Sequence, residues 1–211
     1  MFSEDRFLEA CNELKSPIID EYEFFTESHD VKIYRKYREE SGLYEYKIFG
    51  LLKGVSPETC RQVYVDLEYR KEWDGYVKEL REINEGDKNG VYWQVNFPFP
   101  MSNRDYVFMR ECREFDIDTR KITVVLGQSQ LFASEPELSG VIRVDDFCQS
   151  LALESDGDDG TKAFMYYYDN PKGMIPTWLI NWGAKTGVPK FLTDMQAACK
   201  GYADYLKSKT S

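Results

Sequence analysis

An arginine within an aromatic cluster is the first candidate for binding chemistry in this chain. The aromatic residues that flank Arg70 are Tyr69, Trp73 and Tyr76. In such a partly desolvated setting the guanidinium fork could bind a phosphate group through two parallel hydrogen bonds. The alternative is a salt bridge from Arg70 to Glu68, Glu72 or Asp74, which would be structural only.

Three aromatic residues on separate strand-like segments could recognise a cation. Because side chains alternate between the two faces of a strand, the rings of Trp93, Tyr106 and Phe147 could all point into one cavity. Aromatic faces attract a quaternary ammonium group, so three rings could form a box around one. The alternative for each ring is an ordinary place in the hydrophobic core.

An apolar loop rich in proline follows the segment that carries Trp93. The sequence Phe97-Pro98-Phe99-Pro100-Met101 can form neither a helix nor a central strand, because proline lacks a backbone donor and restricts the residue before it. We therefore expect a stiff, exposed loop with Phe99 and Met101 at its tip. On the strand before it, alternation predicts one apolar face, formed by Val91, Trp93, Val95 and Phe97. The other face is formed by Tyr92, Gln94 and Asn96.

The sequence offers little for catalysis. The single histidine, His29, lies in a predicted turn, and no nucleophile elbow, Walker loop or dinucleotide-binding fingerprint is present. The five cysteines are far apart in the sequence and odd in number: Cys11, Cys60, Cys112, Cys148 and Cys199. They indicate free thiols in a reducing cytoplasm rather than disulfides or a zinc site. We expect no catalytic residue, no metal and no cofactor, with hydrolysis by an unrecognised pair of carboxylates as the alternative.

The order of the predicted elements defines a fold class. A short N-terminal helix precedes three strands, a helix after Ser56-Pro57, about six strands, and a helix from Pro176 to Lys207. The last of the strands are predicted at Gly140–Ser155 and Lys162–Asp169. Short turns between consecutive strands require antiparallel pairing. The sequence thus predicts an α+β domain over residues 1–211, with a curved antiparallel sheet of about nine strands around the long C-terminal helix.

Charge and hydropathy exclude several classes of protein. The net charge of −10 opposes binding to nucleic acid, and no apolar run approaches the ~20 residues of a membrane span. From Pro171 onward, however, six lysines face two acids, so the C-terminal segment carries +4 and the rest of the chain −14. Such a segment could make a transient contact with a membrane surface, and a solvated helix face is the alternative. We expect a cytoplasmic monomer.

Four motifs resemble the START lipid-transfer domains. They are Tyr69-Arg70-Lys71-x-Trp73-Asp74, Pro98 to Tyr106, Ser139 to Val144, and Ile175-Pro176-x-Trp178-Leu179-Ile180-Asn181-Trp182. They occur in the family's order and span nearly the whole chain. The resemblance implies a helix-grip fold, in which a curved nine-stranded antiparallel sheet wraps around the C-terminal helix and encloses one phospholipid in a tunnel. It implies no catalysis.

The resemblance also implies roles for individual residues. Arg70 matches the arginine that pairs with the lipid phosphate, and Tyr64 lines the same head-group region. Trp93 and Tyr106 match members of the aromatic cage around choline. Phe147 occupies the third cage position, where tyrosine is usual, so the ring is retained and its hydroxyl is lost. Gln149 matches a polar residue of the tunnel near the glycerol esters.

The function that follows is a carrier that transfers phosphatidylcholine between membranes. Its membrane-docking residues would be Phe99 and Met101 in the loop and Lys185 and Lys190 in the C-terminal segment. Two alternatives remain. The protein could be a phosphatidylcholine sensor that regulates a partner such as an acyl-CoA thioesterase, or it could carry a sterol or a ceramide.

Overall fold

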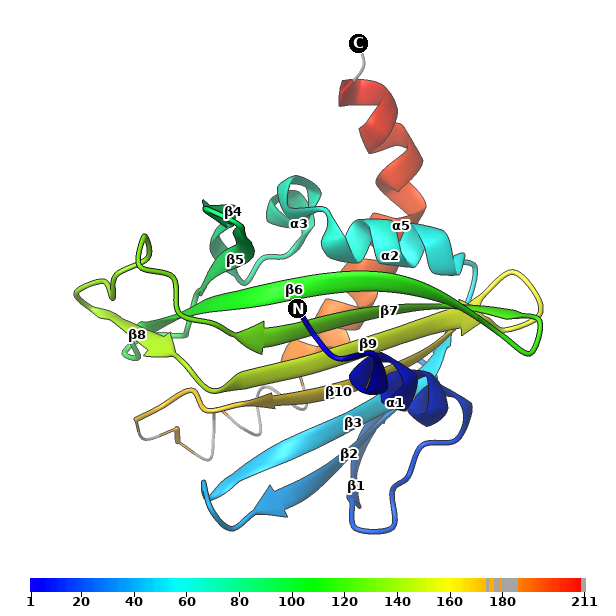
Figure 1. Cartoon of the computed structure of the whole chain (residues 1–211), viewed down its shortest axis with the longest axis horizontal. Helices are drawn as coiled ribbons and strands as arrows, with labels where there is room; N and C mark the ends of the chain where they lie inside the picture. The colour runs from blue at the N-terminus through cyan, green and yellow to red at the C-terminus, as the bar shows by residue number, and fades with distance from the viewer. Residues whose placement is uncertain (174, 177–178, 180–185, 210–211) are drawn as a thin grey trace.

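A computed structural model describes residues 1–173, 175–176, 179 and 186–209 of the chain. Its strands form one sheet, shown in Figure 1. The first strands are β1 (Glu23–Ser28), β2 (Val31–Arg38), β3 (Leu43–Leu52), β4 (Val77–Glu85) and β5 (Lys88–Val95). The others are β6 (Asn103–Ile117), β7 (Arg120–Ser129), β8 (Val141–Val144), β9 (Phe147–Ser155) and β10 (Thr161–Asp169).

The sheet is antiparallel along its main path, as predicted. Its strand order is β1-β2-β3-β10-β9-β7-β6-β5-β4, with β8 beside β6 and outside this path. One prediction was wrong in detail, because the single strand expected at Gly140–Ser155 is divided into β8 and β9. The exposed residues Asp145 and Asp146 separate the two. β8 also pairs with β6 in parallel, whereas every strand was expected to be antiparallel.

The helices are α1 (Glu4–Lys15), α2 (Pro57–Val65), α3 (Leu67–Trp73) and α5 (Val188–Lys209). The start of α2 confirms the prediction, because the Ser56 hydroxyl accepts a hydrogen bond from Thr59 N and Pro57 lies in the first turn. α5 begins at Val188, and most of the helical segment predicted before it lies outside the described residues. Within the described part of the chain, no helix combines the length and apolarity needed to cross a membrane.

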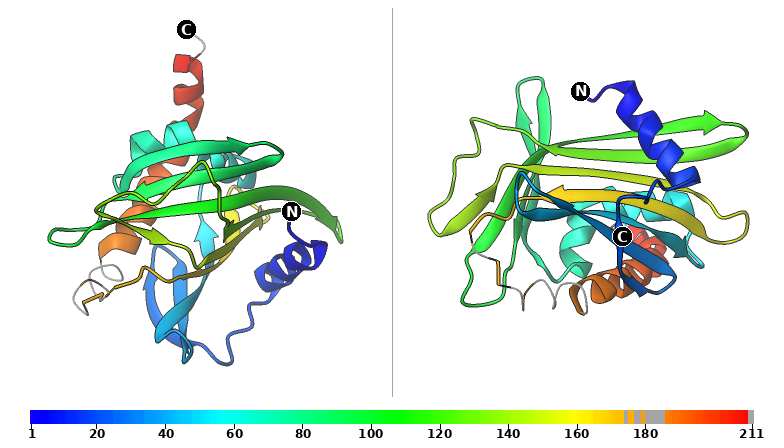
Figure 2. Two further views of the ribbon diagram at one scale, coloured as in Figure 1. Left: turned by 60° about the vertical axis from the view of Figure 1, so that its left-hand side comes forward. Right: turned by 90° about the horizontal axis from the view of Figure 1, so that it is seen from below.

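The two faces of the sheet are covered by different helices. Val124 on β7 packs against α1 with Phe7 and Leu14, while the next residue, Val125, packs with Met195 of α5. Figure 1 shows α1 in front of the sheet and α5 behind it. The views in Figure 2 show the same separation of the two helices by the sheet. The face that α5 covers also meets α2 and α3, so these three helices and this face of the sheet share one interior.

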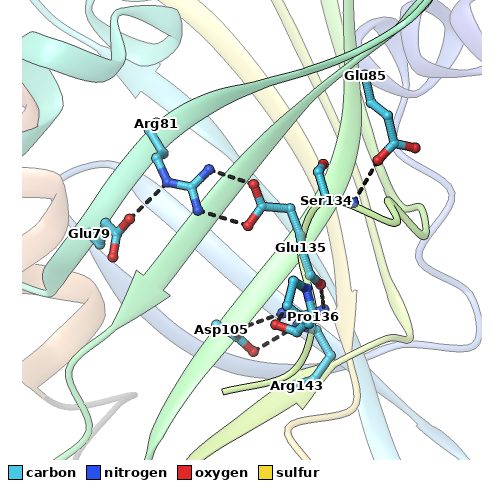
Figure 3. A network of polar contacts seen from close by, with 8 residues as sticks. All are labelled: Glu79, Arg81, Glu85, Asp105, Ser134, Glu135, Pro136 and Arg143. Atoms are coloured by element: carbon cyan, nitrogen blue, oxygen red, sulfur yellow. Dashed lines mark hydrogen bonds and ion pairs between the residues drawn. The ribbon is translucent and has the colours of Figure 1, made fainter.

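A polar network fixes the connection between β7 and β8 (Figure 3). Arg143 on β8 makes two hydrogen bonds of 2.9 Å to the Asp105 carboxylate on β6. In the connection, Glu135 accepts two hydrogen bonds from Arg81 on β4, at 2.6 and 2.8 Å. These bidentate pairs hold the outlying strand β8 against the sheet beside Tyr106.

A buried ion pair joins α1 to β3 and allows a test of stability. Lys47 Nζ on β3 lies 2.7 Å from Glu13 Oε1. We expect Glu13→Ala to lower the free energy of unfolding by about 3 kcal/mol, because the mutation leaves a buried ammonium group without its carboxylate. The measurement is urea unfolding. Glu21→Ala, which removes an exposed partner of Lys36, is the control and should leave the midpoint unchanged. Equal effects of the two mutations would contradict this assignment.

Candidate binding site

A cavity of about 510 Å³ lies between the sheet and the helices α2, α3 and α5. This volume is within the range of sites that enclose most of a ligand, about 300–1,000 Å³. Its wall is largely apolar, with side chains from the sheet and from α5 that include Ile48, Val125, Leu151, Met165, Phe191 and Met195. Only a few polar side chains reach it. A site of this composition suits a long apolar ligand with one polar end.

Alternation along β5 places the predicted face in the cavity wall. Val91, Trp93, Val95 and Phe97 all line the cavity. Tyr92 points to the other side of the sheet, where it packs with Ile83, Val107 and Phe132. Asn96 differs from the prediction, because it lines the cavity although it was expected on the face of Tyr92. The reason is that β5 ends at Val95, so alternation no longer applies at Asn96.

The three rings of the predicted box lie together in the cavity wall. The ring centroids of Trp93 and Tyr106 are 5.1 Å apart, and those of Tyr106 and Phe147 are 5.6 Å apart. Tyr167 on β10 is a fourth ring, which was not predicted from the sequence, and its centroid lies 5.9 Å from that of Phe147. Trp93 Nε1 is buried and has no hydrogen-bond partner among the described residues. Such unpaired donors are uncommon in folded proteins, and a bound ligand is one explanation for them.

Arg70 lines the same cavity and also makes one of the salt bridges considered as an alternative. Its Nε donates to Asp74 Oδ2 over 3.0 Å, and the Asp74 side chain is 2% exposed. The guanidinium carbon lies 4.9 Å from the centroid of the Trp93 ring. For the terminal nitrogens Nη1 and Nη2, no hydrogen bond to another described residue is found. The salt bridge therefore orients the guanidinium group and leaves its fork available to a ligand.

Tyr64 and Gln149 contact each other beside Arg70. Gln149 Nε2 on β9 donates a hydrogen bond to the Tyr64 hydroxyl on α2, and both residues line the cavity. The Arg70 guanidinium carbon is 5.5 Å from the Tyr64 ring. The structure thus brings the five residues predicted for the head group, and Gln149 predicted for the glycerol esters, into the lining of one cavity, while their roles in binding stay predictions.

Two charged residues of the wall were not found from the sequence. Arg110 on β6 donates from Nη2 to the Val65 carbonyl oxygen over 2.8 Å, and desolvation lowers the pKa of its guanidinium group. Asp169, the last residue of β10, accepts hydrogen bonds from two tyrosines of the aromatic box. Desolvation raises the pKa of the Asp169 carboxyl group. The sequence indicated only that Arg110 and Asp169 lie on predicted strands with buried residues on one face.

The predicted docking residues are less closely grouped. Phe99 is 94% exposed at the tip of the loop between β5 and β6, whereas Met101 is half-buried. Lys190, in the first turn of α5, is exposed and forms an ion pair with Asp194 one turn later. Lys185 lies outside the described residues. The loop therefore has the expected exposed apolar residue at Phe99 but not at Met101, and the charge of Lys190 is partly neutralised.

The remaining predictions concern histidine and cysteine. His29 lies in the turn between β1 and β2, as predicted, and it does not line this cavity. All five cysteines are free thiols, as predicted. Among the described residues, no group of three or more histidine, cysteine or acidic side chains could hold a metal ion.

Comparison with known proteins defines the class of this fold and cavity. The START domain family matches residues 11–204. The chain therefore belongs to the START domain family. The crystal structure of human STARD10 has a TM-score of 0.81 with 20% sequence identity, over 99% of this chain and 84% of that one. Human StAR-related lipid transfer protein 5 has a TM-score of 0.78 with 14% identity, over 94% of this chain and 95% of that one. At these identities the two structures support the fold alone.

Relatives at higher sequence identity are similar over nearly their full length. Phosphatidylcholine transfer protein of Mus musculus is 54% identical over 203 residues, which are 95% of this chain and 95% of that protein. Phosphatidylcholine transfer protein of Homo sapiens is 52% identical over the same share of both chains.

Proposed function

We propose that this protein binds one phosphatidylcholine molecule in the cavity and transfers it between membranes without catalysis. The observation that carries the proposal is the position of Arg70 directly against the aromatic box, 4.9 Å from the Trp93 ring. In phosphocholine a two-carbon bridge joins phosphate to ammonium, so its two binding groups must lie side by side. The likeness to two phosphatidylcholine transfer proteins supports the same ligand.

The assigned roles follow the chemistry of each group. The Arg70 fork binds the phosphate with Tyr64 nearby, the rings of Trp93, Tyr106 and Phe147 surround the choline, and Gln149 lies toward the glycerol esters. Each ring contributes about 0.5–2 kcal/mol of cation–π attraction. The protein works without a cofactor, as a cytoplasmic monomer. Contact with an acyl-CoA thioesterase stays a prediction.

The head group decides selectivity in this proposal. The acyl chains leave one apolar environment, the bilayer, for another, the cavity, so their transfer changes the free energy little. The head group instead exchanges water for the cavity wall, which is costly unless its charges find partners. A sterol or a ceramide carries neither phosphate nor quaternary ammonium, so it would leave both the Arg70 fork and the aromatic box unoccupied.

Native mass spectrometry of the protein purified from cells tests the ligand. We expect one copurified phosphatidylcholine per protein chain, released when the protein is denatured and identified by its fragment ions. A copurified sterol or ceramide in its place would overturn the proposal.

The exposed loop between β5 and β6 provides a test of membrane docking. We expect Phe99→Ser to slow the transfer of fluorescent phosphatidylcholine from vesicles about tenfold, because the loop loses a large apolar group that can enter the bilayer. The amount of lipid bound to the purified protein should not change.

The matched control is Phe24→Ser. Phe24 is 56% exposed on β1, the strand at the edge of the sheet opposite β4. Added salt should slow transfer to anionic vesicles by wild type and Phe99→Ser by the same factor, because screening acts only on charges. Equal transfer rates for wild type and Phe99→Ser would show that the loop does not dock.

A further inference from the structure

Asp169 places a carboxylate beside the aromatic box, and the proposed roles in lipid binding do not include it. It is the last residue of β10 and lies opposite Phe147 on β9. Its Oδ2 accepts a hydrogen bond of 2.6 Å from the Tyr106 hydroxyl and one of 3.1 Å from the Tyr167 hydroxyl. The side chain also lines the cavity. Two donors on one oxygen are an arrangement that suits an ionised carboxylate.

No cation of the described protein pairs with this carboxylate. No lysine or arginine among the described residues lies within ion-pair distance of it. Desolvation raises the pKa of the Asp169 carboxylate, and the positive charge of Arg104 acts against this effect and lowers it. That guanidinium group donates instead to the backbone oxygens of Ser102, Pro171 and Lys172, at 2.7 to 3.0 Å. A desolvated carboxylate without an ion pair is costly unless another cation compensates it.

We propose that Asp169 is the counter-charge for the lipid's quaternary ammonium group and determines selectivity for a cationic head group. The inference rests on the proposed function, because it requires phosphocholine to lie in the aromatic box. Asp169 acts at a distance through the two tyrosines rather than by direct contact. It holds the Tyr106 and Tyr167 rings in place, and its charge makes the potential within the box more negative.

The hydrogen bonds to Asp169 also suit the chemistry of choline. A quaternary ammonium group has no N–H and cannot donate a hydrogen bond, so it gains from a negative potential but not from an open acceptor. A primary ammonium group needs acceptors. Two tyrosine hydroxyls already donate to Oδ2. The charge of the carboxylate therefore attracts a quaternary and a primary ammonium group alike, but Oδ2 is not free to accept a hydrogen bond from the primary one. Arg70 lies against the Trp93 ring, and Asp169 accepts a hydrogen bond from Tyr106. The box therefore has a positive and a negative group as neighbours, as the opposite charges of the phosphate and the choline require.

The test compares two lipids that differ in charge and not in shape. One is phosphatidylcholine, and the other carries 3,3-dimethylbutanol in place of choline, so that a carbon atom replaces the charged nitrogen. Wild-type protein is equilibrated with vesicles that contain equal amounts of both, and the bound lipids are counted by mass spectrometry. We expect wild type to prefer the choline lipid and Asp169→Asn to lower this preference about tenfold. Asparagine keeps an oxygen acceptor for the two hydroxyls and removes the charge.

Asp146→Asn is the matched control. Asp146 accepts a hydrogen bond from Tyr168, the neighbour of Tyr167 on β10, but it is exposed and does not line the cavity. Its mutation should leave the preference unchanged. If Asp169→Asn does not fold, Asp169→Ser makes the same test, since it leaves space for a water molecule beside both hydroxyls.

The outcomes separate the two proposals. If wild type binds neither lipid, the proposed function itself is wrong. If wild type binds both lipids equally, or if Asp169→Asn keeps the full preference for choline, lipid binding stands and the role of Asp169 is refuted. A lower melting temperature with an unchanged preference would show that Asp169 is structural only.

Discussion

Arg70→Ala is expected to reduce phosphatidylcholine transfer at least about 30-fold, because a hydrogen bond to a charged group contributes about 2 kcal/mol and the fork makes two. Arg70→Lys should recover only part of the transfer, since a single ammonium group cannot reproduce the fork. The measurement is transfer between vesicles by the purified variants. Lys71→Ala, which removes an exposed neighbour paired with Glu68, is the control and should transfer normally.

The ion pair of Arg70 requires a second control. Arg70→Ala leaves the buried Asp74 carboxylate without its guanidinium partner, and this alone should destabilise the fold by about 3 kcal/mol. The double mutant Arg70→Ala with Asp74→Asn removes both charges and should recover most of the stability. If the double mutant is stable and transfers lipid at the wild-type rate, Arg70 does not bind the phosphate.

Trp93→Ala is expected to have the second large effect, on the choice between head groups. The preference for phosphatidylcholine over phosphatidylethanolamine should fall about tenfold, because the aromatic face favours a bulky, weakly hydrated cation. The measurement is competition between the two lipids in mixed vesicles.

Trp73→Ala is a close control for this mutation. Its ring lies 5.8 Å from the Arg70 guanidinium carbon, but it does not line the cavity. Both mutations remove an indole of similar burial, so both should lower stability, and only Trp93→Ala should change the preference. If Trp93→Ala keeps the full preference for phosphatidylcholine over phosphatidylethanolamine, the aromatic box does not bind choline.

Local patterns predicted much of the fold and of the apolar side of the site. Alternation along β5 put Val91, Trp93 and Val95 on one face, because a buried strand allows only one register. Ser56 and Pro57 marked the start of α2 through the chemistry of its first turn. These features depend on a few neighbouring residues, so the sequence carries them directly.

Features that depend on distant parts of the chain could not be predicted. The parallel pairing of β8 with β6 joins Val141 to Asn103, and no local periodicity encodes such a partner. Two charged residues of the cavity, Arg110 and Asp169, were missed for a similar reason. Asp169 follows three tyrosines at the end of a strand, and carboxylates in such places are usually solvated. Its contacts with Tyr106 and Tyr167 and its place in the cavity wall reveal that it belongs to the site.

The two-residue period of β5 also limits how this cavity can change in evolution. Trp93 lies opposite Tyr106 in the sheet, so the box exists only in this register. A ring can be exchanged for another ring, but one residue inserted into β5 would turn Trp93 to the face now occupied by Tyr92. Changes in chain length should therefore survive in the turns, such as 86–87 and 156–160, while the strands accept substitutions alone.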